Sequence, residues 1–166
     1  MDPTPDITPP IAPPDPTAGP AWCALYPPSR SVSDLVPAFR RCVESFITEL
    51  HRRRCTVTIT STRRPEQRAW LMHYAWDVAH GTLRPDEAPA RADIPIVWTV
   101  EGAHAMVDTY RLAYRPALTS RHIEGRSIDM SIAGWPGTLP DLYALGKAYG
   151  VKKLVTDPPH WSDDGR

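Results

Sequence analysis

The sequence has no excess of charge of either sign. Its 166 residues contain 19 Lys plus Arg and 19 Asp plus Glu, so the formal net charge is zero. A protein that binds nucleic acids through their phosphates normally carries a basic excess. The charge balance therefore argues against a nucleic-acid partner.

Cysteine is also scarce, with three residues in the whole chain. Cys23, Cys42 and Cys55 form no CxxC pair and lie in no Cys/His cluster. An odd number with this spacing supports neither a disulfide framework nor a thiolate zinc site. We therefore expect buried or half-buried free thiols, which is the usual state of unpaired cysteine.

Long apolar runs are missing as well. No stretch approaches the roughly 20 apolar residues that a membrane helix needs. The first ten residues, MDPTPDITPP, lack the basic start and apolar segment of a secretory signal. We expect a soluble chain that is made in the cytoplasm and has no membrane partner.

Proline, by contrast, is concentrated at one end of the chain. Ten of the 20 prolines fall within the first 28 residues. This density disfavours helices and interrupts strand pairing, and it is typical of extended or disordered segments. We expect residues 1–30 to form an arm, either a spacer or a ligand for a partner domain, and residues 31–166 to form the folded domain.

Beyond the arm, hydrophobic periodicity predicts a mixture of helices and strands. Apolar residues recur every three or four positions over 34–53, which indicates an amphipathic helix. The alternating, β-branched segment 56–61 indicates a strand. Further helices are expected over 65–80, 99–114 and 140–149, further strands over 127–132 and 152–156, and a loop over 82–98. These elements predict an α+β fold with a small antiparallel sheet flanked by helices.

The segment SRHIEGRSID, residues 120–129, contains two candidate metal ligands. Apolar and polar residues alternate after Ser127, so Ile128 lies on the core side and Asp129 on the opposite side. Gly125 provides a turn that could fold His122 back over this strand. A carboxylate among core residues needs a partner, and a metal ion is one candidate. A His and an Asp at this spacing also occur without a metal.

The segment DPPHW, residues 157–161, adds a histidine and a carboxylate. Two consecutive prolines favour polyproline geometry with three residues per turn, so Asp157 and His160 should project to the same side. A rigid turn with a surface histidine is the alternative. Two histidines and a carboxylate are the protein ligands of a catalytic zinc site with an open fourth position. These ligand types favour zinc but do not require it.

Together these segments resemble the motifs of one zinc peptidase family. SRHIEGRSID resembles the SxHxxGxAxD motif of the D-alanyl-D-alanine carboxypeptidase and L-alanyl-D-glutamate endopeptidase family, and DPPHW resembles its second motif. Upstream, TSTRRPEQ at residues 60–67 resembles the family's strand-to-helix segment TSxYRxxxxQ. All three occur in the family's order, over residues 56–162.

The resemblance implies a fold like that of the DD-peptidases and hedgehog proteins, one zinc ion, and hydrolysis of peptidoglycan stem peptides. It makes residues 31–166 the zinc peptidase domain. It assigns the zinc to His122, Asp129 and His160. It makes Asp157 the general base and Arg64 the group that stabilises the oxyanion, with Arg63 a less favoured candidate. It implies that Ser120 and Trp161 contact the substrate or wall the site.

Two departures from the family's pattern bear on the substrate. Ser127 stands where the family commonly has alanine, and Asp157 stands where carboxypeptidase members have glutamate. Because aspartate is commoner among endopeptidase members, an L-Ala-D-Glu endopeptidase is expected, with a D-Ala-D-Ala carboxypeptidase as the alternative. Without a secretory signal, such an enzyme would reach the wall after lysis, as a phage lysin does, or through a specialised secretion machine.

Other function classes fit the sequence less well. A serine hydrolase built on Ser120, His122 and Asp129 would lack a GxSxG elbow, and there is no HExxH string for a proteinase of that type. A non-catalytic metal-binding module for the cell wall stays open. The presence of both Asp157 and Arg64 argues against that module.

Overall fold

A computed structural model describes residues 15–166. Within this part the chain forms two compact units, each built from two separate segments. Unit 1 contains residues up to 27 together with 67–118, and unit 2 contains 28–66 together with 119–166. The helices and the small antiparallel sheet confirm the predicted α+β class.

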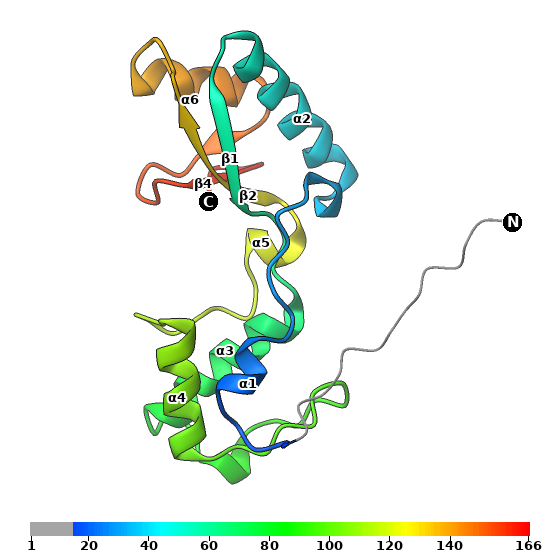
Figure 1. Ribbon diagram of the computed structural model, residues 1–166, viewed down its shortest axis with the longest axis vertical. Helices are drawn as coiled ribbons and strands as arrows, with labels where there is room; N and C mark the ends of the chain where they lie inside the picture. Colours follow the sequence, from blue (N-terminus) through cyan, green and yellow to red (C-terminus); the bar gives the residue numbers. More distant parts are fainter. Residues whose placement is uncertain (1–14) are drawn as a thin grey trace, which may run out of the picture. The chain divides into compact units, whose positions relative to one another are not determined.

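Unit 2 contains the whole sheet. Its strands are β1 (Thr56–Ser61), β2 (Ser127–Ala133), β3 (Lys152–Lys153) and β4 (His160–Ser162), in the spatial order β1-β2-β4-β3 with antiparallel pairing throughout. Its helices are α2 (Pro37–Arg52), α5 (Arg121–Glu124) and α6 (Leu139–Ala148), with a short 3-10 helix at Val32–Asp34. Strand β2 therefore lies inside the sheet, between β1 and β4 (Figure 1).

One face of this sheet packs against α2 and α6 (Figure 1). The apolar stripe predicted for 34–53 is confirmed, because α2 buries four of its members: Phe39, Val43, Phe46 and Leu50. Phe46 lies against Trp161 of β4, with 5.4 Å between the ring centroids. Full burial of a large apolar side chain contributes about 1.5–3 kcal/mol, so this layer stabilises the sheet strongly.

The opposite face of the sheet is polar. Asp129 of β2 and His160 of β4 are direct cross-strand partners, so their side chains share this face. Thr58 and Ser131, which pair across β1 and β2, are both exposed. The polar face is therefore partly open to solvent, and the candidate ligands lie on it.

Unit 1 contains α1 (Pro20–Cys23), α4 (Val100–Tyr110), a 3-10 helix at Pro85–Glu87, and α3 (Glu66–Ala79), which begins at the end of unit 2. Its core has three buried tryptophans, Trp22, Trp70 and Trp98. The buried Asp77 carboxylate is paired in bidentate fashion with Arg115, at 2.7 and 2.6 Å. Pairing of this kind keeps a buried charge from destabilising the core.

Residues 15–27 differ from the extended arm that we expected. They contain the short helix α1, and Trp22 in that helix is 1% exposed. The Ala18 amide donates to the Val97 carbonyl at 2.8 Å, and the Val97 amide donates to the Pro16 carbonyl at the same distance. Burial of apolar side chains such as Trp22 and Cys23 stabilises this segment, although its prolines restrict the backbone. The rest of the expected arm, residues 1–14, lies outside the described residues, and the boundary at residue 30 stays a prediction.

Three other expectations about elements need correction. The strand expected over 152–156 ends at Lys153, and the helix expected to reach Tyr114 ends at Tyr110. The polyproline conformation expected around Pro158 is a turn, closed by a hydrogen bond of 3.1 Å from the His160 amide to the Asp157 carbonyl. The chain then continues directly into β4, which the sequence did not predict.

The expected state of the cysteines is confirmed. Cys23 and Cys55 are buried, Cys42 is half-buried, and all three are free thiols. Within residues 15–166, no helix combines the length and apolar character needed to cross a membrane.

Gly102 of α4 gives a test of the unit 1 fold. A Cβ at this position would lie 2.0 Å from the Ala18 carbonyl oxygen. Gly102→Ala should therefore displace the segment that carries α1 and destabilise the protein by about 1–3 kcal/mol, as overpacking does. Denaturant unfolding and hydrogen exchange of the α1 amides measure this effect.

Gly19→Ala is the matched control, because its Cβ would meet only one atom, at 4.0 Å. Equal stability of the two variants would contradict the close packing of α1 on α4.

Candidate metal site

Three predicted ligands meet on the polar face of the sheet in unit 2. One ligand atom from each of His122, Asp129 and His160 lies within 4.8 Å of the others. His122 Nε2 is 3.0 Å from Asp129 Oδ1 and 3.2 Å from His160 Nδ1. His160 Nδ1 is 3.3 Å from the same Asp129 oxygen. This group could hold a metal ion.

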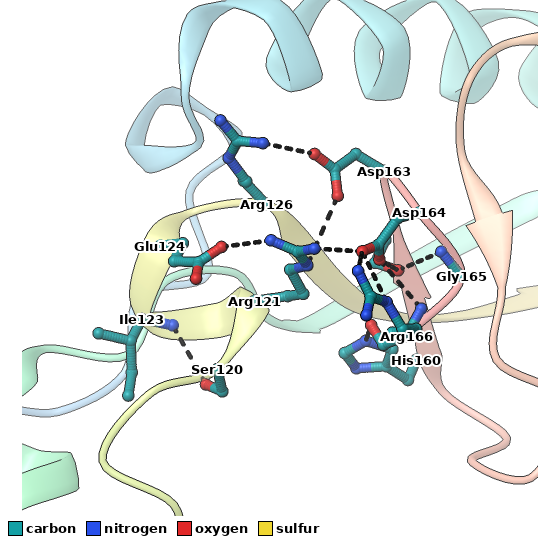
Figure 2. Close-up of polar contacts among 11 residues, drawn as sticks. Ser120, Arg121, Ile123, Glu124, Arg126, His160, Asp163, Asp164, Gly165 and Arg166 are labelled. Atoms are coloured by element: carbon teal, nitrogen blue, oxygen red, sulfur yellow. Dashed lines mark hydrogen bonds and ion pairs between the residues drawn. The ribbon is translucent and has the colours of Figure 1, made fainter.

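Helix α5 positions His122. Ser120 caps the helix by accepting a hydrogen bond from the Ile123 amide at 3.4 Å (Figure 2). The helix ends after one turn at Gly125, whose φ of 71° is in the left-handed region. A glycine adopts this conformation without steric cost, so the chain can reverse into β2. The predicted turn at Gly125 is thus confirmed.

Backbone carbonyls fix the orientation of both imidazoles. His122 Nδ1 lies 2.7 Å from the Thr62 carbonyl oxygen, and His160 Nε2 lies 3.1 Å from that of Arg166. A carbonyl oxygen only accepts, so each of these ring nitrogens must carry the proton. In neutral rings, the lone pairs of His122 Nε2 and His160 Nδ1 are then left facing each other. Such a pair of lone pairs needs a proton or a cation between them.

The carboxylate supplies negative charge to the same point. Burial raises the pKa of the Asp129 carboxyl. His122 and His160 together lower it by more than burial raises it, so the net pKa lies well below the usual range. Burial lowers the pKa of His160, whereas its bonds to Asp129 and Arg166 and the charge of Asp157 raise it, with a net increase. Asp129 is therefore an anion near neutral pH, and the site attracts positive charge.

The three candidate ligand atoms lie 3.0, 3.2 and 3.3 Å apart, so a single ion could contact all of them. The Asp129 side chain is 24% exposed, so solvent reaches the cluster from the polar face.

Asp157 lies in the turn that leads into His160. It is exposed, and it lies close enough for its charge to raise the pKa of His160. Lys153 holds this turn, because its ammonium group donates to the backbone carbonyls of Leu154, Asp157 and His160, the last at 3.0 Å. The sequence did not single out Lys153, and only its place beside the turn could have indicated it.

The third motif contacts the site through its backbone. The Arg64 amide donates to the His122 carbonyl at 3.0 Å, and the Thr62 carbonyl accepts from the His122 ring. Arg64 is half-buried, and its neighbour Arg63 is exposed. All three motifs that carry the family resemblance therefore meet around His122, Asp129 and His160.

Two predicted contact residues have different surroundings. Ser120 is half-buried at the start of α5, where its hydroxyl caps the helix. Trp161 is 2% exposed and pairs with Ile128 on the core face, away from His160. The structure therefore does not bring the Trp161 ring to the ligand cluster. The sequence also did not indicate Thr62 and Arg166, because they act through backbone carbonyls, which any residue type provides.

Comparison with known proteins adds no family to these observations. No family model matches the chain, and no curated protein does either.

Metal binding can be tested directly. The wild-type protein should bind one divalent ion per chain, with Co²⁺ giving a visible absorption spectrum typical of tetrahedral N/O ligands. Loss of a residue that only hydrogen-bonds a metal ligand lowers metal affinity by up to about 100-fold. His160→Ala removes a ligand itself, so it should weaken metal binding by more than this. Titration calorimetry and Co²⁺ absorption measure both effects.

His104→Ala is the control, because His104 is an exposed histidine of α4 in unit 1. An affinity in His160→Ala as high as in the control would remove His160 from the ligand set.

Proposed function

We propose that the protein is a zinc-dependent peptidase that hydrolyses peptidoglycan stem peptides. The observation that carries this proposal is the convergence of the three motifs on two imidazole lone pairs and a carboxylate in unit 2. Histidine and carboxylate ligands favour zinc over softer alternatives such as copper(I). The resemblance to the D-alanyl-D-alanine carboxypeptidase and L-alanyl-D-glutamate endopeptidase family supports this choice of substrate.

His122, Asp129 and His160 would hold the zinc. When bound, zinc polarises the scissile carbonyl group and makes water more acidic. The Thr62 and Arg166 carbonyls keep the two histidines in the tautomers that expose a lone pair. These contacts fix the orientation of both rings, so the ligand set is pre-oriented.

Asp157 is proposed as the general base. It is exposed to solvent, it lies in the turn that leads into His160, and its charge helps to raise the pKa of that ligand. A carboxylate in this place can accept a proton from the attacking water and return it to the leaving amine. Lys153 limits the movement of the turn by binding three of its carbonyls.

Arg64 is proposed to stabilise the negative charge that develops on the carbonyl oxygen. Its backbone amide is tied to the His122 carbonyl at 3.0 Å, so the residue starts beside the ligand cluster. A fixed cation aimed at a developing oxyanion is a large contributor to catalysis. Arg63 stays the less favoured candidate, and Ser120 stays a proposed substrate contact.

Within this substrate class, an L-Ala-D-Glu endopeptidase is favoured by the aspartate at position 157, and a D-Ala-D-Ala carboxypeptidase is the alternative. Mass spectrometry of the products of digested peptidoglycan distinguishes the two bonds. We propose that the protein acts on the wall after lysis or specialised secretion. The Pro-rich segment, residues 1–30, is proposed to bind a partner. Residues 1–14 of this segment lie outside the described part of the chain.

Asp157→Asn tests the general base. The variant should keep its zinc, because Asp157 is not a ligand, and should lose about 10²–10⁴-fold in kcat. Metal analysis and release of muropeptides measure the two properties separately.

Asp108→Asn, at an exposed position of α4, is the control. Full activity of Asp157→Asn would remove Asp157 as the base. Zinc binding without hydrolysis by the wild-type protein would instead favour the non-catalytic metal-binding module.

The two neighbouring arginines can be separated by substitution. Arg64→Gln should lower kcat by about 10²–10³-fold with metal affinity unchanged, as loss of an oxyanion donor does. Arg63→Gln should stay close to wild type. Steady-state kinetics on a purified stem peptide checks both variants, and the reverse pattern would assign the role to Arg63.

A further inference from the structure

We propose that Arg121 and Asp164 are positioning residues of the metal site, whose ion pair holds the Arg166 carbonyl against His160. The inference rests on the proposed metal site and concerns how its second histidine is oriented. The family resemblance assigns no ligand or catalytic role to either residue. Both lie in unit 2, and Figure 2 shows them together with Arg166 and His160.

The Asp164 carboxylate is the centre of a set of polar contacts (Figure 2). It is paired with the guanidinium of Arg121, and it accepts from the Ser162 hydroxyl at 3.3 Å. It also accepts from Arg166 twice, from the backbone amide at 3.1 Å and from Nε at 3.0 Å. One carboxylate therefore fixes both the backbone and the side chain of Arg166.

The Arg166 backbone in turn contacts His160. Its carbonyl oxygen lies 3.1 Å from His160 Nε2, which must donate the proton. This bond selects the tautomer that leaves Nδ1 free to face His122 and Asp129. Displacement of the segment would allow the His160 ring to rotate or to change tautomer, and a metal would then lose a pre-oriented ligand.

Arg121 connects this segment to the other histidine. It precedes His122 in α5, so one residue of the helix anchors the chain that orients the second ligand, and the following residue is the first ligand. Hydrogen bonds from Arg121 are the main reason that the pKa of Asp164 lies well below its usual range, so the carboxylate stays charged. Glu124 holds the Arg121 guanidinium from the other side, at 2.6 Å.

A second ion pair on the same segment provides a matched control. Arg126 pairs with Asp163 at 3.2 Å (Figure 2). Arg121 also pairs with Asp163, at 3.8 Å, so three ion pairs join the segment following β4 to the α5–β2 region. Of the two carboxylates, Asp164 is the one that accepts from the Arg166 backbone and so leads to His160. Loss of Arg126 should cost only the small free energy of an exposed ion pair.

The experiment compares Asp164→Asn, Arg121→Gln and Arg126→Gln in the full chain. The first readout is the tautomer of His160 in the metal-free protein, from long-range ¹H–¹⁵N NMR spectra. Wild type and Arg126→Gln should show a proton on Nε2, whereas Asp164→Asn and Arg121→Gln should show a mixture of tautomers. The second readout is Co²⁺ and Zn²⁺ affinity, which should fall about 10–100-fold in the same two variants.

The double variant Arg121→Gln/Asp164→Asn should lose no more affinity than the worse single variant, because the two residues act as one unit. An unchanged His160 tautomer and unchanged affinity in both single variants would overturn the proposal. If either Asp164→Asn or Arg121→Gln fails to fold, the His160 tautomer and the metal affinity of the other variant test the proposal. If the wild-type protein binds no metal, the proposed function fails, and the metal-free tautomer still decides whether Asp164 orients His160.

Discussion

The candidate site depends on two hydrogen bonds from imidazole rings to backbone carbonyls. Because Thr62 and Arg166 accept these bonds, His122 and His160 must each present a lone pair toward the other, 3.2 Å away. Two lone pairs beside an anionic Asp129 make an arrangement that is unfavourable until positive charge enters it. The orientation of both rings therefore depends on the positions of those two carbonyls.

The sheet joins this polar site to the core, because adjacent residues of one strand point to opposite faces. On β4, His160 lies on the polar face, while the next residue, Trp161, is 2% exposed and packs on Phe46. The core layer under α2 and α6 thus fixes the backbone from which the ligands project. A substitution in that layer would move the ligands as well as lower the stability, so the site is best probed by changes on the polar face.

Periodicity predicted most of unit 2, including β1, β2, α6 and the buried stripe of α2. The ligand set could be proposed because His122, Asp129 and His160 lie in motifs with characteristic spacing. The failures came where long-range packing decides the outcome, as for α1, which burial of Trp22 stabilises despite its prolines. The carbonyl contacts of Thr62 and Arg166 could not be predicted, since backbone groups leave no trace in the sequence.

Burial separates the roles of the site residues. The two histidines are 8% exposed, and backbone carbonyls hold one ring nitrogen of each. Asp157, by contrast, is exposed and lies in the turn that leads into His160. Metal binding therefore depends on residues that the fold orders, and the proposed hydrolysis depends in addition on a solvent-facing carboxylate. The same scaffold could keep the first property without the second, so the choice between the proposed enzyme and a module that only binds metal depends on Asp157.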